Sequence, residues 1–251
     1  MKSTELDIVI PVYNEGENII DTLRALKREV KTPFRVLICY DFENDNTLPA
    51  VERIRSELGF EVLPVKNHGV GVHSAVTTGF AVSRASAVLV YPADEAYNIN
   101  IVDRMYAAFR SGSDIVVASR FMQGGSMEGG PPLKSILVRL ASFLLHRFVG
   151  VPASDASYGL RLFSRRILDA VEIESTQGFT YAIELLVKCH RLKWKIAEIP
   201  AQWRRREKGG SRFNLTKWLP HYFRWFRYAL QTTYRKKLPN TVKLKSGVTL
   251  R

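Results

Sequence analysis

The feature of this sequence that most limits its fold is an alternation of short apolar runs with helical patterns through residues 6–119. The apolar runs cover 6–12, 34–40, 60–65, 86–91 and 114–119. Helical spacing of apolar residues lies between them, over 17–30, 47–58, about 72–83 and 103–110. Strands that alternate with helices in this way indicate right-handed crossover connections and a sheet covered on both faces. We therefore predict an α/β domain with a mixed, largely parallel sheet.

Polar side chains follow four of the predicted strands, at the point where each strand ends. They are Tyr13 and Glu15 after the first strand, Asp41 after the second, Asn67 after the third, and Asp94 and Glu95 after the fourth. Ligands of such sheets bind at the carboxyl ends of the strands. We therefore expect these loops to converge on one edge of the sheet, which we call the rim.

The chain shows no pattern of export or of membrane spanning. Its first residues lack a basic leader followed by an apolar block, and no apolar stretch approaches the roughly 18 residues that a spanning helix needs. These features predict a cytoplasmic protein. Cys39 and Cys189 lie in apolar contexts without disulfide or metal spacing, so we expect both to be core thiols. The five histidines show no ligand spacing either.

Positive charge is concentrated near the C-terminus. The formal net charge is +13, and residues 187–251 carry 18 Lys and Arg against two acidic residues. Such asymmetry favours an anionic partner, either a membrane surface or nucleic acid, over a merely solvated tail.

Two helical segments of different character follow the alternating region. Residues 133–150 are apolar nearly all round, which is typical of a deeply buried or lipid-facing helix. Residues 217–237 place aromatic and basic side chains on neighbouring faces, as in a helix that lies in a bilayer interface. The alternative is a helix docked on the sheet with a solvated basic edge. We divide the chain into a main domain, 1–213, and a basic amphipathic membrane-interface segment, 214–251.

The Gly- and Pro-rich stretch 121–132 separates the last predicted strand from the apolar helical segment. A connection of this length is either a mobile lid over a site or a solvated loop.

Several short motifs, taken in order, resemble glycosyltransferase family 2. PVYNE (11–15), YDFENDNT (40–47), NHGVG (67–71) and PADE (92–95) follow the four strands. DASYGLR (155–161) is similar to the Asp-x-Thr-Ser-Gly-Phe-Arg signature of the polyprenyl-phosphate, dolichyl-phosphate mannose synthase-like subgroup. REKGGSR (206–212) fits that subgroup's Arg-x-x-Gly-x-Ser-Lys pattern. The resemblance implies a three-layer nucleotide-diphospho-sugar transferase fold of the GT-A type for residues 1–213.

On the donor side, the resemblance implies transfer of a sugar, with inversion, from a UDP- or GDP-activated donor. The residues expected to line the nucleotide are Pro11, Tyr13, Glu15, Asp41 and Asn67. The family's Asp-x-Asp turn matches Pro92-Ala93-Asp94, so Asp94, with Glu95 beside it, is expected to hold Mg or Mn. Carboxylates suit these hard cations, which neutralise a leaving diphosphate.

Two departures from the family pattern lie in this donor region. Pro92 replaces the first aspartate of the turn, and Tyr40 replaces the first acid of an Asp-Asp pair. The base and sugar preference, or activity itself, is therefore open.

On the acceptor side, the resemblance implies that Asp155 approaches the acceptor and that Arg161 holds phosphate oxygens. Ser157, Arg206, Ser211 and Arg212 are expected to assist in binding the acceptor or the phosphates. An acceptor hydroxyl needs a general base, whereas a lipid phosphate is already anionic and does not. Asp155 then either acts as a base, or orients the acceptor or binds metal.

The predicted partners are a nucleotide-diphosphate sugar, a polyprenyl phosphate and an anionic membrane surface on the cytoplasmic side, together with a membrane partner subunit. Other hypotheses keep the fold but use a non-lipid glycan acceptor, or drop the reaction and leave a binding module. A nucleic-acid binder is also an alternative, because Trp218, Tyr222, Trp225 and Tyr228 are interleaved with arginines. The acidic rim disfavours it. The pattern Gly69-x-Gly71 fails as a dinucleotide motif at Ser74.

Overall fold

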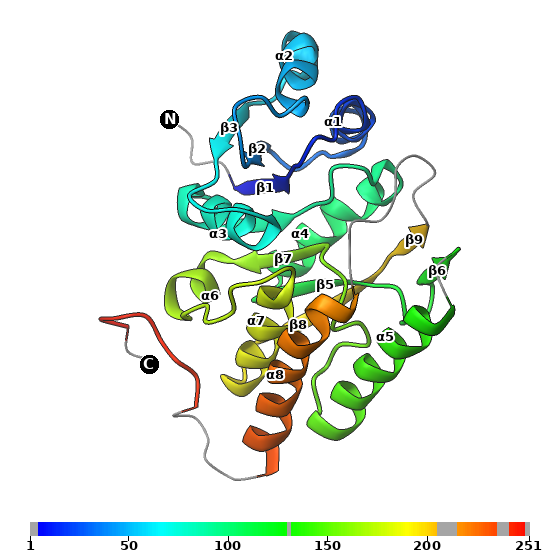
Figure 1. Cartoon of the computed structure of the whole chain (residues 1–251), viewed down its shortest axis with the longest axis vertical. Helices are drawn as coiled ribbons and strands as arrows, with labels where there is room; N and C mark the ends of the chain where they lie inside the picture. Colours follow the sequence, from blue (N-terminus) through cyan, green and yellow to red (C-terminus); the bar gives the residue numbers. More distant parts are fainter. Residues whose placement is uncertain (1–4, 130–131, 205–214, 235–240, 249–251) are drawn as a thin grey trace.

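The computed structural model describes residues 5–129, 132–204, 215–234 and 241–248, without the side chains of 132–134 and 215–219 (Figure 1). Its main sheet has the strand order β3-β2-β1-β4-β7-β5-β8. The strands are β1 (Leu6–Pro11), β2 (Phe34–Tyr40), β3 (Val62–Lys66), β4 (Ala87–Val90), β5 (Ile115–Ser119), β7 (Arg161–Ser164) and β8 (Ile196–Pro200). Only β7 runs antiparallel to its neighbours, β4 and β5. The mixed, largely parallel sheet is therefore confirmed.

Helices cover both faces of the sheet (Figure 1). They are α1 (Asn18–Glu29), α2 (Thr47–Leu58), α3 (Val72–Val82), α4 (Val102–Arg110), α5 (Pro132–Leu144), α6 (Arg165–Ala170), α7 (Thr180–Arg191) and α8 (Leu215–Tyr234). A 3₁₀ turn, η1 (Ala96–Ile101), precedes α4, and a π-helical turn, η2 (Leu145–Val149), extends α5.

Alternate residues of the strands pack into two separate cores, one on each face of the sheet. In β1, Ile8 packs in the cluster that includes residues of α1, α2 and α4. Its neighbour Val9 packs in the cluster that includes residues of α3, α6, α7 and α8. Because both faces are covered, the central strands are continuously apolar instead of alternating. The result is the three-layer α/β architecture that the motifs implied.

Part of the stretch 121–132 is a strand. β6 (Ser126–Glu128) pairs in parallel with β9 (Gln202–Arg204) in a second, two-stranded sheet, with Met127 opposite Trp203. The prediction of a lid or a solvated loop missed this strand, because its partner lies more than 70 residues further along the chain.

The two late helices differ in how much of their apolar surface is buried. α8 packs against α7, and its Trp225 is only 2% exposed, with the Lys188 ammonium 5.1 Å from the ring centroid. This side of α8 is the docked helix of our alternative. α5, in contrast, leaves Ile136 61% and Phe143 57% exposed. No helix in the described part of the chain is both long and apolar enough to span a bilayer.

Both cysteines are free and buried, which confirms them as core thiols. Burial raises the pKa of the Cys39 thiol to about 12, so it stays protonated and unreactive at neutral pH.

Candidate active site

The ends of β1 to β4 meet at one edge of the sheet, as the strand-end rule predicted. Tyr40 pairs with Lys66, Pro11 pairs with Cys39, and Val9 pairs with Val90, so the loops that follow these strands emerge together. Because β7 is antiparallel, the residues that precede it arrive at the same edge. The topology therefore brings residues 155–161, which we call the motif loop, to the rim beside residues 92–95, the acidic turn.

Asp41 and Asn67 form one hydrogen-bonded unit at the β2 and β3 end of the rim. The Asn67 side-chain amide donates to the Asp41 carboxylate at 2.6 Å, and the Gly71 backbone N–H donates to its other oxygen at 2.8 Å. The side-chain carbonyl oxygen of Asn67 in turn accepts from the Ser74 hydroxyl at 2.7 Å. The structure thus joins two residues predicted for the nucleotide site, and this pair shapes the loop that enters α3.

The loop after β1 is held by the segment that begins α2. The Asn14 N–H donates to the Asp45 carboxylate at 2.9 Å, and the Glu15 N–H donates to the Thr47 hydroxyl at 3.0 Å. Tyr13 is half-exposed, and its ring meets the edge of Phe42 at a centroid distance of 5.3 Å. Pro11 is the last residue of β1, before this loop. Tyr13 and Phe42 therefore present an aromatic surface at the rim, suited to contact with a planar base.

Within the acidic turn, the two acidic residues differ in exposure. Asp94 is partly exposed, whereas Glu95 is buried. The Glu95 carboxylate accepts hydrogen bonds from the Tyr158 hydroxyl and, at 3.3 Å, from the Asn98 amide. Burial raises the pKa of Glu95 to about 7. The prediction of Glu95 as a metal ligand does not fit this geometry, because its hydrogen-bond donors lie inside the protein.

The described residues contain no group of three His, Cys, Asp or Glu side chains that could hold a metal ion. Asp94 alone supplies a carboxylate from the acidic turn to the rim. Magnesium is commonly held by one or two carboxylates together with substrate phosphates, instead of by a cage of protein ligands alone. The site therefore fits Mg or Mn only as a shared site, in which a bound diphosphate provides further oxygens.

Asp155 is fully buried and paired with Arg120. The guanidinium donates from Nε to Oδ2 at 2.7 Å and from Nη2 to Oδ1 at 3.0 Å. Backbone N–H groups of Ser157 and Tyr158 also donate to Oδ1, at 3.1 and 3.2 Å. Burial by itself raises the pKa of Asp155, but the charge and hydrogen bonds of Arg120 outweigh it and lower the pKa below its ordinary value. The predicted approach of this carboxylate to an acceptor is therefore not what the structure shows.

Arg161 also points inward. It is fully buried, and its guanidinium donates to the Ala182 carbonyl at 2.5 Å and to the Asp155 carbonyl at 3.2 Å. Burial lowers the pKa of Arg161 to about 10. The prediction that it holds phosphate oxygens is not supported by this arrangement, because β7 lies inside the sheet with helices on both faces. Arg161 instead ties the motif loop to α7.

Arg120 is the site residue that our sequence reasoning missed. It follows β5 directly, and its guanidinium donates to the Ser157 hydroxyl at 2.7 Å and lies 4.8 Å from the centroid of the Tyr158 ring. The strand-end rule, extended to the fifth predicted strand, would have found it. Ser157 is partly exposed beside it, and its hydroxyl also donates to the Asp155 carboxylate at 3.1 Å. Arg206, Ser211 and Arg212 lie outside the described residues.

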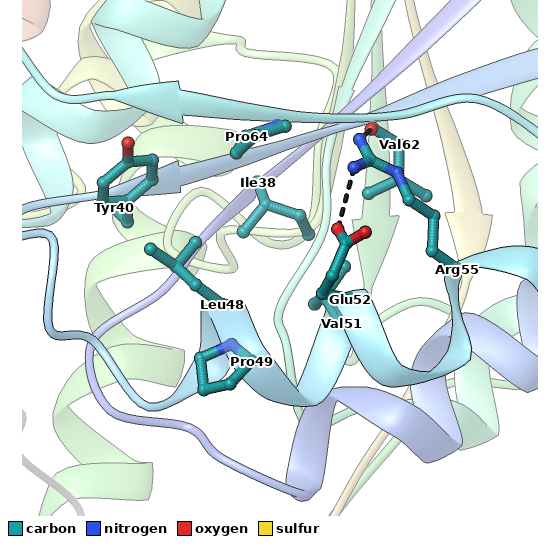
Figure 2. Close-up of a pocket in the computed structure, with 9 residues that line it drawn as sticks. All are labelled: Ile38, Tyr40, Leu48, Pro49, Val51, Glu52, Arg55, Val62 and Pro64. Atoms are coloured by element: carbon teal, nitrogen blue, oxygen red, sulfur yellow. Dashed lines mark hydrogen bonds and ion pairs between the residues drawn. The ribbon is translucent and has the colours of Figure 1, made fainter.

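Hollows also lie elsewhere on the described part of the protein. A pocket of about 330 Å³ lies between α2 and the β2–β3 edge, where Tyr40 lines one end and the Glu52–Arg55 ion pair the other (Figure 2). The Tyr40 hydroxyl donates to Glu43 at 3.2 Å, so this ring lies beside the loop that follows β2. Tyr40 is the residue that replaces an acid of the family pattern.

The second hollow is a groove of about 670 Å³ beside α3 and α6. His73 and Ser175 contribute to its lining, and their Nε2 and hydroxyl oxygen are 2.9 Å apart. Arg165 also lines it, but its guanidinium already donates to the carbonyls of Phe80 and Ala85.

Comparison with known proteins relates the chain to sugar-transferring enzymes. The sequence pattern of Glycosyl transferase family 2 matches residues 7–171. The dolichol-phosphate mannosyltransferase of Pyrococcus furiosus is 22% identical over 232 residues, which cover 89% of this chain and 64% of the relative. The polyprenol monophosphomannose synthase of Mycolicibacterium smegmatis is 23% identical over 213 residues, which cover 82% of this chain and 80% of the relative. The chain thus spans less than two thirds of the archaeal enzyme.

The fold is also found among solved structures. Glucosyl-3-phosphoglycerate synthase from Mycobacterium tuberculosis, in complex with Mn²⁺, UDP and glucosyl-3-phosphoglycerate, matches with a TM-score of 0.62 at 18% identity. The match covers 98% of this chain and 82% of that one. It confirms the GT-A architecture implied by the motifs.

Proposed function

Since the chain belongs to glycosyltransferase family 2, we propose that it transfers a sugar, with inversion, from a UDP- or GDP-activated donor to a polyprenyl phosphate. The observation that carries the proposal is the meeting of the acidic turn and the motif loop at one rim. The names of two relatives, a dolichol-phosphate mannosyltransferase and a polyprenol monophosphomannose synthase, support the class of acceptor.

On the donor side, Asp94 would hold Mg or Mn together with the donor's phosphate oxygens. Such an ion, when bound, neutralises the charge that develops on the leaving diphosphate. Tyr13 contacts the base, and the Asp41–Asn67 pair keeps the neighbouring loop in its shape. The Mn²⁺ and UDP in the glucosyl-3-phosphoglycerate synthase complex support this part of the proposal.

The state of Asp155 favours a phosphate acceptor over a hydroxyl acceptor. A hydroxyl must lose a proton to a base as it attacks, but the Asp155 carboxylate is buried and occupied by Arg120 and by backbone N–H groups. A phosphate monoester is anionic near neutral pH and needs no such base. Ser157, held by Arg120, supplies a hydroxyl to the acceptor side of the rim. A non-lipid glycan acceptor is the less favoured alternative.

The exposed side of α5 and η2 is the surface that we propose rests on a membrane. Its apolar face consists of Ile136, Leu137, Leu140, Phe143 and Phe148, all exposed. Arg139 and Arg147 flank this face, and the sequence has no Asp or Glu from 129 to 154 or after Glu207. An apolar stripe bordered by cations fits an anionic bilayer surface. Tyr234 of α8 donates to the Phe148 carbonyl at 2.8 Å, which places α8 beside this face (Figure 1).

This assignment moves the main membrane contact from the 214–251 segment to α5. It leaves the protein peripherally bound at the cytoplasmic side, and a membrane partner subunit would cover the same face. The burial of Trp225 in α8 disfavours the nucleic-acid alternative, because a buried ring cannot stack on a base.

Calorimetric titration of the protein with UDP and GDP, each with and without Mn, tests the donor half of the proposal. Metal-dependent micromolar binding of one nucleotide supports it and selects the donor. Transfer from the matching nucleotide sugar to a polyprenyl phosphate in vesicles then tests the acceptor half. Failure to bind either nucleotide would instead support a binding module that has lost the reaction.

A further inference from the structure

The acidic turn and the motif loop are joined inside the protein by a buried hydrogen-bond cluster. The Tyr158 hydroxyl donates to the Glu95 carboxylate and accepts from the Asn98 amide at 3.0 Å. Asn98 also donates to the Gln202 carbonyl at 2.6 Å and accepts from the Gln202 N–H at 3.1 Å. Each of the three side chains at its centre is less than a tenth exposed. The cluster therefore links the ends of β4 and β7 to β9.

Tyr158 also contacts both members of the Arg120–Asp155 pair. Its backbone N–H donates to Asp155, and its ring lies against the Arg120 guanidinium. One residue thus contacts both the inward carboxylate of the acidic turn and the ion pair of the motif loop. In the signature quoted above for the family, a serine stands at this position. A serine hydroxyl is too short to make the contact that Tyr158 makes with Glu95.

We propose that Tyr158 is a positioning residue that keeps Glu95 turned inward, so that Asp94 alone faces a bound donor and its metal. The proposal rests on the function proposed above and concerns the same site. Without the hydroxyl, the buried Glu95 carboxylate keeps only Asn98 as a donor. An ionised carboxylate that is buried with too few donors is costly, so ionised Glu95 would turn towards the rim beside Asp94.

The first test compares metal binding in three variants, measured by calorimetric titration of Mn into the complex with nucleotide. Glu95→Gln should change the Mn affinity by less than twofold, because the side-chain carbonyl of the introduced glutamine still accepts from Tyr158. Tyr158→Phe should tighten Mn binding at least fivefold, because a second carboxylate reaches the rim. The double variant should return to within twofold of the wild type. A tenfold loss of Mn affinity in Glu95→Gln would overturn the proposal, since Glu95 would then already be a ligand.

The second test does not depend on the proposed reaction. At pH 8, where Glu95 is mostly ionised, the effects of Tyr158→Phe and Glu95→Ala on urea unfolding should be non-additive in the double variant. The expected coupling is about tenfold in the unfolding equilibrium constant, as for a hydrogen bond to a charged group. Coupling below twofold would sink the proposal even if transfer is observed. A wild-type protein that binds no nucleotide but shows the full coupling would instead count against the proposed function alone.

A matched control is available away from the rim. The Tyr106 hydroxyl of α4 donates to the Glu5 carboxylate at 2.5 Å, just before β1 begins. Tyr106→Phe removes the same kind of contact at the opposite edge of the sheet and should leave Mn affinity unchanged.

In the transfer assay, Tyr158→Phe should lower kcat about tenfold without a matching rise in the acceptor KM, whereas Tyr106→Phe should change neither.

Discussion

Arg120 and Asp155 form a two-point ion pair, with Nε to Oδ2 at 2.7 Å and Nη2 to Oδ1 at 3.0 Å, and both side chains are buried. The two residues come from different elements, the end of β5 and the loop before β7. The pair thus fastens the motif loop to the parallel part of the sheet.

Removing one partner of this pair should be strongly destabilising. Arg120→Met leaves the Asp155 carboxylate buried without its cation, which typically costs about 3–5 kcal/mol. Urea denaturation at neutral pH measures the change. The exposed pair of Arg24 with Glu57 is the control, and Arg24→Met should cost at most about 1 kcal/mol. Equal losses in the two variants would show that the buried pair does not fasten the loop.

Asp94→Asn should weaken metal-dependent nucleotide binding, because an amide is a neutral and weaker ligand for Mg or Mn. We expect at least a tenfold loss of Mn affinity in the presence of the nucleotide, measured by calorimetry. Asp21→Asn, on the exposed side of α1, changes the net charge equally and should have no effect. An Asp94→Asn protein with wild-type affinity would remove Asp94 from the site.

The stability of the protein should depend on His73 below pH 6.5. Burial lowers the pKa of His73 to about 4, so the unfolded chain takes up a proton more readily than the folded protein between pH 6.5 and 4. Stability is therefore lost as the pH falls through this window, by up to about 3 kcal/mol from this group. His73→Gln should flatten that part of the curve of unfolding free energy against pH. His68→Gln, at an exposed position, should leave the curve unchanged.

Binding to anionic vesicles should depend on α5 and not on Trp225. Ile136→Ser combined with Phe143→Ser removes two exposed apolar side chains and should lower the vesicle partition coefficient at least tenfold at an unchanged melting temperature. Trp225→Ser should lower the melting temperature instead, because that ring is buried against α7. Val82→Ser is a control on an exposed apolar residue of α3. Cosedimentation with phosphatidylserine vesicles measures partitioning, and retention by the double variant would contradict the α5 assignment.

Much of the fold was predictable because the signals are local. The apolar runs predicted β2 over residues 34–40, and the helical spacing predicted α2 over residues 47–58, as the structure has them. The strands that we did not predict pair with segments that are distant in the sequence. β7 enters the sheet between β4 and β5, and β6 pairs with β9, and no spacing within either segment indicates such a partner.

The candidate site divides in the same way. The order of strands and polar loops along the chain was enough to place Asp41, Asn67 and Asp94 at one rim. Only the folded protein shows that Glu95 turns inward to Tyr158 and that Asp155 turns inward to Arg120. A local pattern records the type and order of side chains. The direction in which a charged side chain points is set by the donors that surround it, and here those donors come from segments far along the chain.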